Sequence, residues 1–137
     1  MGITHYTDSM HKALMKIIAT EPIDFVQFNY SITARNAETK LLLLAKEKGV
    51  ATIINPPLGE GKLMSSLNGK RLPSWAYEYG IENWSQYFLK FIIASDAVTC
   101  IIPGTSNPQR IANNMKAGSD LLPIRMQQKM VDYLATI

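Results

Sequence analysis

The residue types best suited to bind an anion lie together in the last third of the sequence. Arg110 follows a turn rich in Thr, Ser and Asn, and Asn113 and Asn114 come three and four residues later. On a helix this spacing places both amides beside the guanidinium. A guanidinium is a planar fork of donors that matches phosphate, and a helix N-terminus adds free backbone N–H groups. The segment therefore predicts a phosphate site, with an ordinary turn and a surface arginine as the alternative.

A strand, a turn and a helix are needed to position this arginine. Residues 98–102 are apolar or β-branched, which predicts a strand buried on both faces. Pro103 and Gly104 end that strand. Residues 105–107 (TSN) offer side chains that can cap a helix, and Pro108 suits its first position.

Two amides form a second polar feature, on the strand predicted for residues 23–30. Gln27 and Asn29 share one face of this strand because side chains alternate along it. If they are buried, both amides need hydrogen-bond partners. Because they lie at the C-terminal end of the strand, a ligand is favoured, and neighbouring backbone is the alternative.

The remaining sequence alternates between strand and helix patterns. After a short strand at residues 3–6, apolar residues at helical spacing predict a helix over residues 9–20. The later segments are predicted at residues 36–48 (helix), 50–54 (buried strand), 55–61 (loop), 73–80 (short helix), 84–95 (helix), 108–118 (helix) and 123–137 (helix). In the helix at 36–48, Leu41 to Leu44 face a core and Gly49 ends the helix. The helix at 84–95 has a stripe of aromatic residues that packs in the core. This order predicts a parallel sheet of the α/β class.

Composition narrows the class of protein. The 137 residues are 47% hydrophobic and 18% charged, which is typical of one globular domain. The net charge is only +3, and no run of like charges indicates a nucleic-acid or membrane surface. No apolar run is long enough to span a membrane, and no signal peptide is evident. We therefore expect a cytoplasmic protein that binds neither nucleic acid nor membrane.

Single reactive side chains are assigned structural roles. Cys100 is the only cysteine, so no intrachain disulfide is possible, and its apolar strand predicts a buried, inert thiol. His11 is expected on a helix surface, and Tyr6 and Tyr30 are expected to pack rather than donate protons. No metal site is predicted.

Four segments together resemble the aldo-keto reductase family. In that family's order and at its spacing they are residues 2–6 (GITHY), 24–31 (DFVQFNYS), 55–59 (NPPLG) and 102–114 (IPGTSNPQRIANN). The resemblance covers essentially the whole chain but only the C-terminal half of the family's (β/α)8 barrel. It implies that residues 1–137 are a single domain, half of a TIM barrel, containing about four parallel strands, the fifth to the eighth, and the C-terminal helices.

The resemblance implies NADP(H) as the cofactor and assigns each site residue a role. Thr4 and His5 fall where the family holds the nicotinamide amide, and Gln27 shares that role. Asn55 replaces a stacking Tyr, and Gly104 replaces a Lys near the 2′-phosphate, so NAD versus NADP preference stays open. Asn113 falls where an acidic residue is common. The loop beside the pyrophosphate corresponds to Pro57, Leu58 and Gly59. The remaining phosphate and adenine contacts correspond to Thr105, Ser106, Arg110 and Asn114.

The family's catalytic Asp, Tyr, Lys and His have no counterpart in this sequence, because they belong to the first four strands. We therefore expect no catalytic residue, and a small carbonyl compound as substrate only if the barrel is completed. Three interpretations stay open: a truncated or partial reductase, a non-enzymatic nucleotide-binding or assembly module, and a half-enzyme completed in trans.

The strand count also predicts association. A closed barrel has no sheet edges, whereas four strands leave two edges and a bare inner face. We expect a homodimer in which the first strand of one copy lies beside the last strand of the other, or pairing with a separate N-terminal half.

Overall fold

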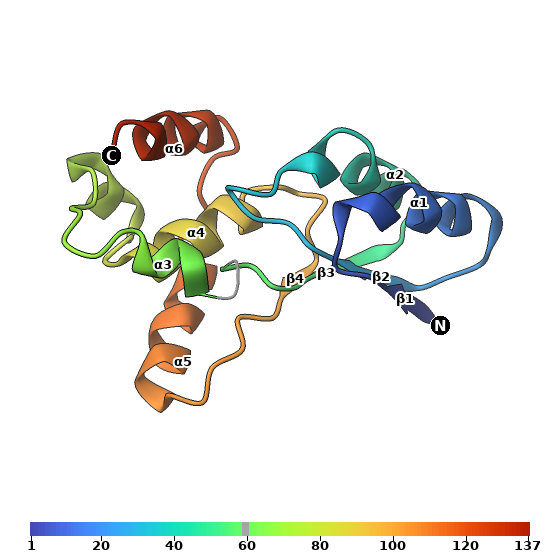
Figure 1. The fold of residues 1–137 in the computed structure, drawn as a ribbon, viewed down its shortest axis with the longest axis horizontal. Helices are drawn as coiled ribbons and strands as arrows, with labels where there is room; N and C mark the ends of the chain where they lie inside the picture. The colour runs from blue at the N-terminus through green and yellow to red at the C-terminus, as the bar shows by residue number, and fades with distance from the viewer. Residues whose placement is uncertain (59–60) are drawn as a thin grey trace.

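The structure, a computed structural model, describes residues 1–58 and 61–137, and its centre is a four-stranded parallel sheet (Figure 1). The strands are β1 (Gly2–Thr4), β2 (Phe25–Phe28), β3 (Ala51–Ile54) and β4 (Cys100–Ile101). They lie in the sheet in chain order, and each neighbouring pair is parallel. Helical segments connect them, as parallel strands require. The predicted α/β alternation of strand and helix is confirmed.

Helices account for most of the remaining ordered backbone. The α-helices are α1 (His11–Thr20), α2 (Leu41–Glu47), α3 (Lys62–Ser65), α4 (Trp84–Ile93), α5 (Pro108–Met115) and α6 (Met126–Ala135). Short 3-10 helices are η1 (Asp8–Met10), η2 (Asn36–Glu38), η4 (Ser74–Tyr79) and η5 (Lys116–Gly118). Figure 1 shows α1 and α2 beside the strands, whereas α3, α5 and α6 lie toward the opposite end of the molecule.

One predicted helix is divided in two. Residues 36–48 were expected to form a single helix, but η2 and α2 are separated at Thr39 and Lys40, where Lys40 has φ −146° and ψ −46°. The Thr39 hydroxyl donates to the carbonyl of Asn36 at 2.9 Å, and the Asn36 amide donates to Asp8. These local side-chain bonds compete with the helical pattern. After α2, Gly49 adopts φ +68°, which suits glycine at a helix end.

The core lies between one face of the sheet and the helices. Val26 and Phe28 of β2 and Ile54 of β3 are fully buried on this face. Leu14 of α1 and Leu41 of α2 join the same apolar cluster, together with the aromatic residues of α4, which confirms the predicted packing role of that stripe. The expectation that Leu41 to Leu44 all face the core is wrong at Leu43, which is 60% exposed because successive helical positions turn away from a single packed face.

The other face of the sheet is open. Directly paired residues of a parallel ladder share a face, and the paired set on this side includes Thr4, Gln27, Ile53 and Cys100. Phe25, on the same side, is 48% exposed. In Figure 1 no described element lies against this side of β1 and β2. Parallel sheets are normally covered on both faces.

Two sequence expectations fail at β4 for this reason. The strand is only two residues long and not buried on both faces, and Cys100 is an exposed free thiol rather than a buried one. β4 is also an edge strand: it pairs with β3 on one side, and within the described ranges no strand pairs with its other side. In residues 1–58 and 61–137, no helix is long and apolar enough to cross a membrane.

Candidate functional site

The carboxyl ends of the strands bring together four segments that are distant in sequence. Backbone bonds extend the ladder beyond the strands: the His5 N–H donates to the carbonyl of Gln27 at 3.0 Å, and the Asn55 N–H donates to that of Phe28 at 3.1 Å. The Ile102 N–H donates to the carbonyl of Ile54 at 3.0 Å. The segments that follow β1, β2, β3 and β4 therefore begin at one edge, which is where barrel enzymes place their sites.

Two polar side chains of this edge face the open side of the sheet. Thr4 is exposed and Gln27 is half-buried, and the two are directly paired in the β1–β2 ladder. Neither side chain makes a hydrogen bond to the part of the chain that the structure describes. Their hydroxyl and amide groups are therefore available to a polar ligand on this face.

Asn29 has a different environment from Gln27. Its amide donates to Asp8 at 2.6 Å, and its carbonyl oxygen lies 3.0 Å from Nε2 of His11. The expectation that both amides favour a ligand is therefore not met at Asn29, whose partners come from the protein itself. The strand ends at Phe28, and the chain then turns toward the helices.

His5 is oriented by its own loop. Its Nδ1 accepts the backbone N–H of Tyr6 at 3.0 Å and lies 3.3 Å from the Thr7 hydroxyl. Because Nδ1 accepts, the proton of the neutral ring resides on Nε2. A half-buried His5 can thus donate from Nε2 to a carbonyl oxygen.

The turn before α5 forms the cap that the sequence predicts. Asn107 is the N-cap, and its side-chain oxygen accepts the backbone N–H groups of Gln109 and Arg110 at 2.9 and 3.3 Å. Pro108 occupies the first turn and has no N–H. The expectation of free N–H groups at this helix start is therefore wrong for Gln109 and Arg110, because the cap already satisfies them.

Other donors remain at this turn. The backbone N–H groups of Gly104, Thr105 and Ser106 have no hydrogen-bond partner within the described ranges. A Cβ added to Gly104 would meet nothing within 4 Å, so the space above the turn is open. Arg110 is exposed and makes no ion pair with a described residue. An anion here would meet Arg110 and the turn rather than the first helical N–H groups.

Asn113 and Asn114 lie one turn beyond Arg110 and are half-buried. The Gln86 side chain of α4 donates to the Asn113 carbonyl at 3.1 Å, which fixes α5 against α4. Asn114 lines an apolar cavity of about 380 Å³ between β4, α4 and α5, together with Leu89 and Ile111.

The structure describes residues 55–58 of the loop that follows β3. Asn55 and Leu58 are half-buried, whereas Pro57 is buried. Leu58 also contacts the core. Gly59, predicted beside the pyrophosphate, lies outside the described residues.

The Tyr30 side chain is buried and hydrogen-bonded within the protein, which does not suit proton transfer to a ligand. It is 1% exposed, and its hydroxyl donates to Glu38 at 2.7 Å, while Arg35 pairs with the same carboxylate at 2.8 Å. Burial and the adjacent Glu38 raise the pKa of the Tyr30 phenol. Its side chain therefore acts as a packing and hydrogen-bonding group.

Sequence reasoning missed a polar cluster beside this edge. His11, expected on a surface, is 7% exposed and contacts Asn29 and Asp8. Its burial comes from Phe28, whose ring meets the imidazole edge-on at 5.9 Å. The only sequence signal was the spacing of Asp8 and His11, three residues apart at a helix start.

Comparisons with known proteins agree with this fold. A family model described as "Aldo/keto reductase family" matches residues 1–134. Among solved structures, the chain is similar to the holo form of an aldo-keto reductase from Bacillus halodurans, with 18% sequence identity and a TM-score of 0.69. That match covers 94% of this chain and 48% of the other, so this chain spans about half of its length. At this identity the likeness shows the fold alone, that of part of a barrel. A search of curated proteins found no match.

Proposed function

The chain belongs to the aldo/keto reductase family, and from this premise we propose that it is the NADP(H)-binding half of a cytoplasmic carbonyl reductase. One observation carries the proposal: Thr4, His5, Gln27, Asn55 and the turn at residues 104–106 all begin at the carboxyl edge of one sheet. In this proposal residues 1–137 are a single domain, equivalent to strands 5–8 and the C-terminal helices of the barrel.

The chemistry of these residues fits a nicotinamide dinucleotide. At one end of the edge, Gln27 and the Nε2–H of His5 supply an amide and a donor suited to a carboxamide. At the other end, Arg110 and the N–H groups of residues 104–106 suit phosphate oxygens. The bound cofactor would supply a hydride to the carbonyl carbon of a small substrate.

The proton for the carbonyl oxygen must come from another group. Tyr30 is buried against Glu38, and neither His5 nor His11 corresponds to the family's catalytic histidine. We propose that a separate N-terminal barrel half supplies the general acid, since a second copy of this chain lacks the same catalytic residues. Because a general acid contributes roughly 10²–10⁴-fold, we expect no turnover of a reactive aldehyde with NADPH by this chain alone.

Cofactor binding is tested by titrating NADPH fluorescence. Replacing Arg110 with Ala removes one charged hydrogen-bond donor, so we expect binding to weaken by about 1.5–3 kcal/mol. Arg125→Ala is the matched control, because Arg125 is also exposed and lies beyond α5. Unchanged affinity in Arg110→Ala would remove this arginine from the site. Equal loss in both variants would indicate a nonspecific charge effect.

A further inference from the structure

Helix α5 carries Arg110 but buries little of its own surface. None of its residues is buried, and its two large apolar residues, Ile111 and Met115, are 49% and 74% exposed. Along residues 108–120, Ala117 of η5 is the one buried residue. Figure 1 shows α5 below α4 and away from α1 and α2. Most helices are fixed by packing an apolar face against the protein, so α5 requires a different attachment.

Two polar side chains of α4 are buried on a helix whose other buried residues are aromatic or aliphatic. Gln86 is 0% exposed and Lys90 is 2% exposed. They are four residues apart, so both project from the same face of α4. Burying an amide without partners costs free energy, and burying an ammonium group costs more. Both side chains therefore need hydrogen-bond acceptors from a neighbouring segment.

Main-chain carbonyls of the segment that contains α5 and η5 supply these acceptors. Nε2 of Gln86 donates to the carbonyl of Asn113 at 3.1 Å, and its Oε1 accepts the backbone N–H of Glu82 at 2.8 Å. The second bond fixes the orientation of the amide. Nζ of Lys90 donates to the carbonyls of residues 119 and 120, the latter at 2.9 Å. Within the described ranges Lys90 forms no ion pair, so these carbonyls are its partners.

The three bonds attach the segment in the last turn of α5 and just beyond η5. Helical bonding leaves the last carbonyls of a helix free, and a cation near them is favourable because that end carries partial negative charge. An exposed ion pair between Lys116 and Glu82 joins the same two regions but contributes little. Arg110 lies one turn before Asn113, so fixing the main chain at Asn113 also fixes the position of Arg110.

We propose that Gln86 and Lys90 are positioning residues for the phosphate end of the cofactor site, because they hold the main chain of α5 and thereby place Arg110. Neither side chain contacts the ligand in this proposal. The inference rests on the proposed function for its ligand, a dinucleotide phosphate, whereas the attachment of α5 to α4 can be tested without that ligand. Because the bonds go to main-chain carbonyls, they hold α5 whatever side chains it carries.

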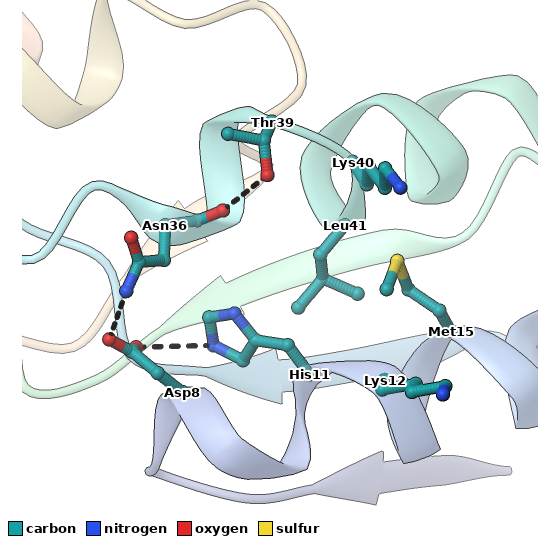
Figure 2. A pocket seen from close by; sticks show the side chains of 8 residues that line it. All are labelled: Asp8, His11, Lys12, Met15, Asn36, Thr39, Lys40 and Leu41. Carbon is teal, nitrogen blue, oxygen red and sulfur yellow. Dashed lines mark hydrogen bonds and ion pairs between the residues drawn. The ribbon is translucent and has the colours of Figure 1, made fainter.

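Amide hydrogen exchange of the full chain tests the attachment. Lys90→Met places an apolar group of similar length in the buried site and leaves two carbonyls without a donor, and Gln86→Met does the same at one carbonyl. In both variants we expect at least tenfold faster exchange at residues 111–115, with the amides of β2 and β3 unchanged. Lys12→Met is the matched control, because Lys12 is exposed on α1 and Figure 2 shows no hydrogen bond from its side chain.

NADPH titration tests the consequence for binding through a double-mutant cycle. Lys90→Met should weaken NADPH binding at least tenfold in the unmodified chain, but at most threefold when Arg110 is already Ala, because the position of an absent guanidinium no longer matters. Lys12→Met removes the same charge elsewhere and should change the affinity less than twofold.

The outcomes separate this inference from the proposed function. Unchanged exchange in α5, or an equal loss of NADPH affinity with and without Arg110, would overturn the positioning role and leave the proposed function standing. If the unmodified chain binds no NADPH, the proposed function and the positioning role both fail. Faster exchange confined to α5, together with a loss of affinity that depends on Arg110, supports both.

Discussion

The two faces of the sheet use alternate residues of the same strands but have opposite environments. In β2, Phe28 is fully buried beneath the helices, while Phe25, three residues earlier, is 48% exposed on the open face. The covered face is apolar and packed, whereas the open face mixes Phe25 and Ile53 with Thr4 and Gln27. The covered face thus accounts for the stability of the fold, and the open face retains the groups suited to a ligand and the surface suited to a partner.

The largest expected effect is the loss of a packed aromatic ring from the covered face. Phe28→Ala should destabilise the chain by about 3–5 kcal/mol, since truncation leaves a cavity among closely packed neighbours. Phe25→Ala is the matched change on the open face and should cost about 1 kcal/mol or less. Urea unfolding at low protein concentration measures both, and similar losses would contradict the assignment of the two faces.

Association through the open face should respond to charge. Burying Phe25 against a second copy, or against a separate barrel half, would be favourable, whereas Phe25→Asp would bury an unpaired carboxylate. We expect self-association of the unmodified chain at micromolar concentration and at least tenfold weaker association of Phe25→Asp, about 1.4 kcal/mol or more. Sedimentation equilibrium measures this. A monomeric unmodified chain with cooperative unfolding would refute the homodimer.

The smallest effect concerns the polar cluster at the margin of the covered face. The pKa of Asp8 is lowered in the folded state, so its contribution to stability is present above its unfolded value of 3.8 and is lost as pH falls toward the folded pKa. Because the Asp8 side chain is 42% exposed, solvent screening limits this contribution to about 1 kcal/mol or less.

Asp8→Asn should therefore lower stability near pH 7 slightly and flatten its decline below pH 4. Asp132→Asn is a suitable control, since this exposed carboxylate lies on α6, outside the Asp8 cluster, and accepts a hydrogen bond from Gln128. Unfolding curves from pH 2.5 to 7 measure the difference. The same acid dependence in Asp8→Asn and the unmodified chain would contradict the role assigned to Asp8.

The sequence by itself determined the order of the elements and several of their ends. Apolar spacing located α1 and α4, Pro108 and the TSN turn located the start of α5, and Gly49 marked the end of α2. The four motifs predicted the family, which the match over residues 1–134 confirms. These features depend on neighbouring residues and on backbone preferences, which a linear sequence contains.

The tertiary structure alone decided which faces are covered. Residues 98–102 have the composition of a buried strand, yet Cys100 is exposed because it lies on the last strand of the sheet and borders an open cavity rather than a packed layer. His11 lies at a polar helix start, yet it is buried because Phe28 and Asn29 reach it from β2 and the residue after it. Periodicity specifies the face on which a side chain lies, but burial depends on the segment that packs against that face, which comes from a distant part of the chain.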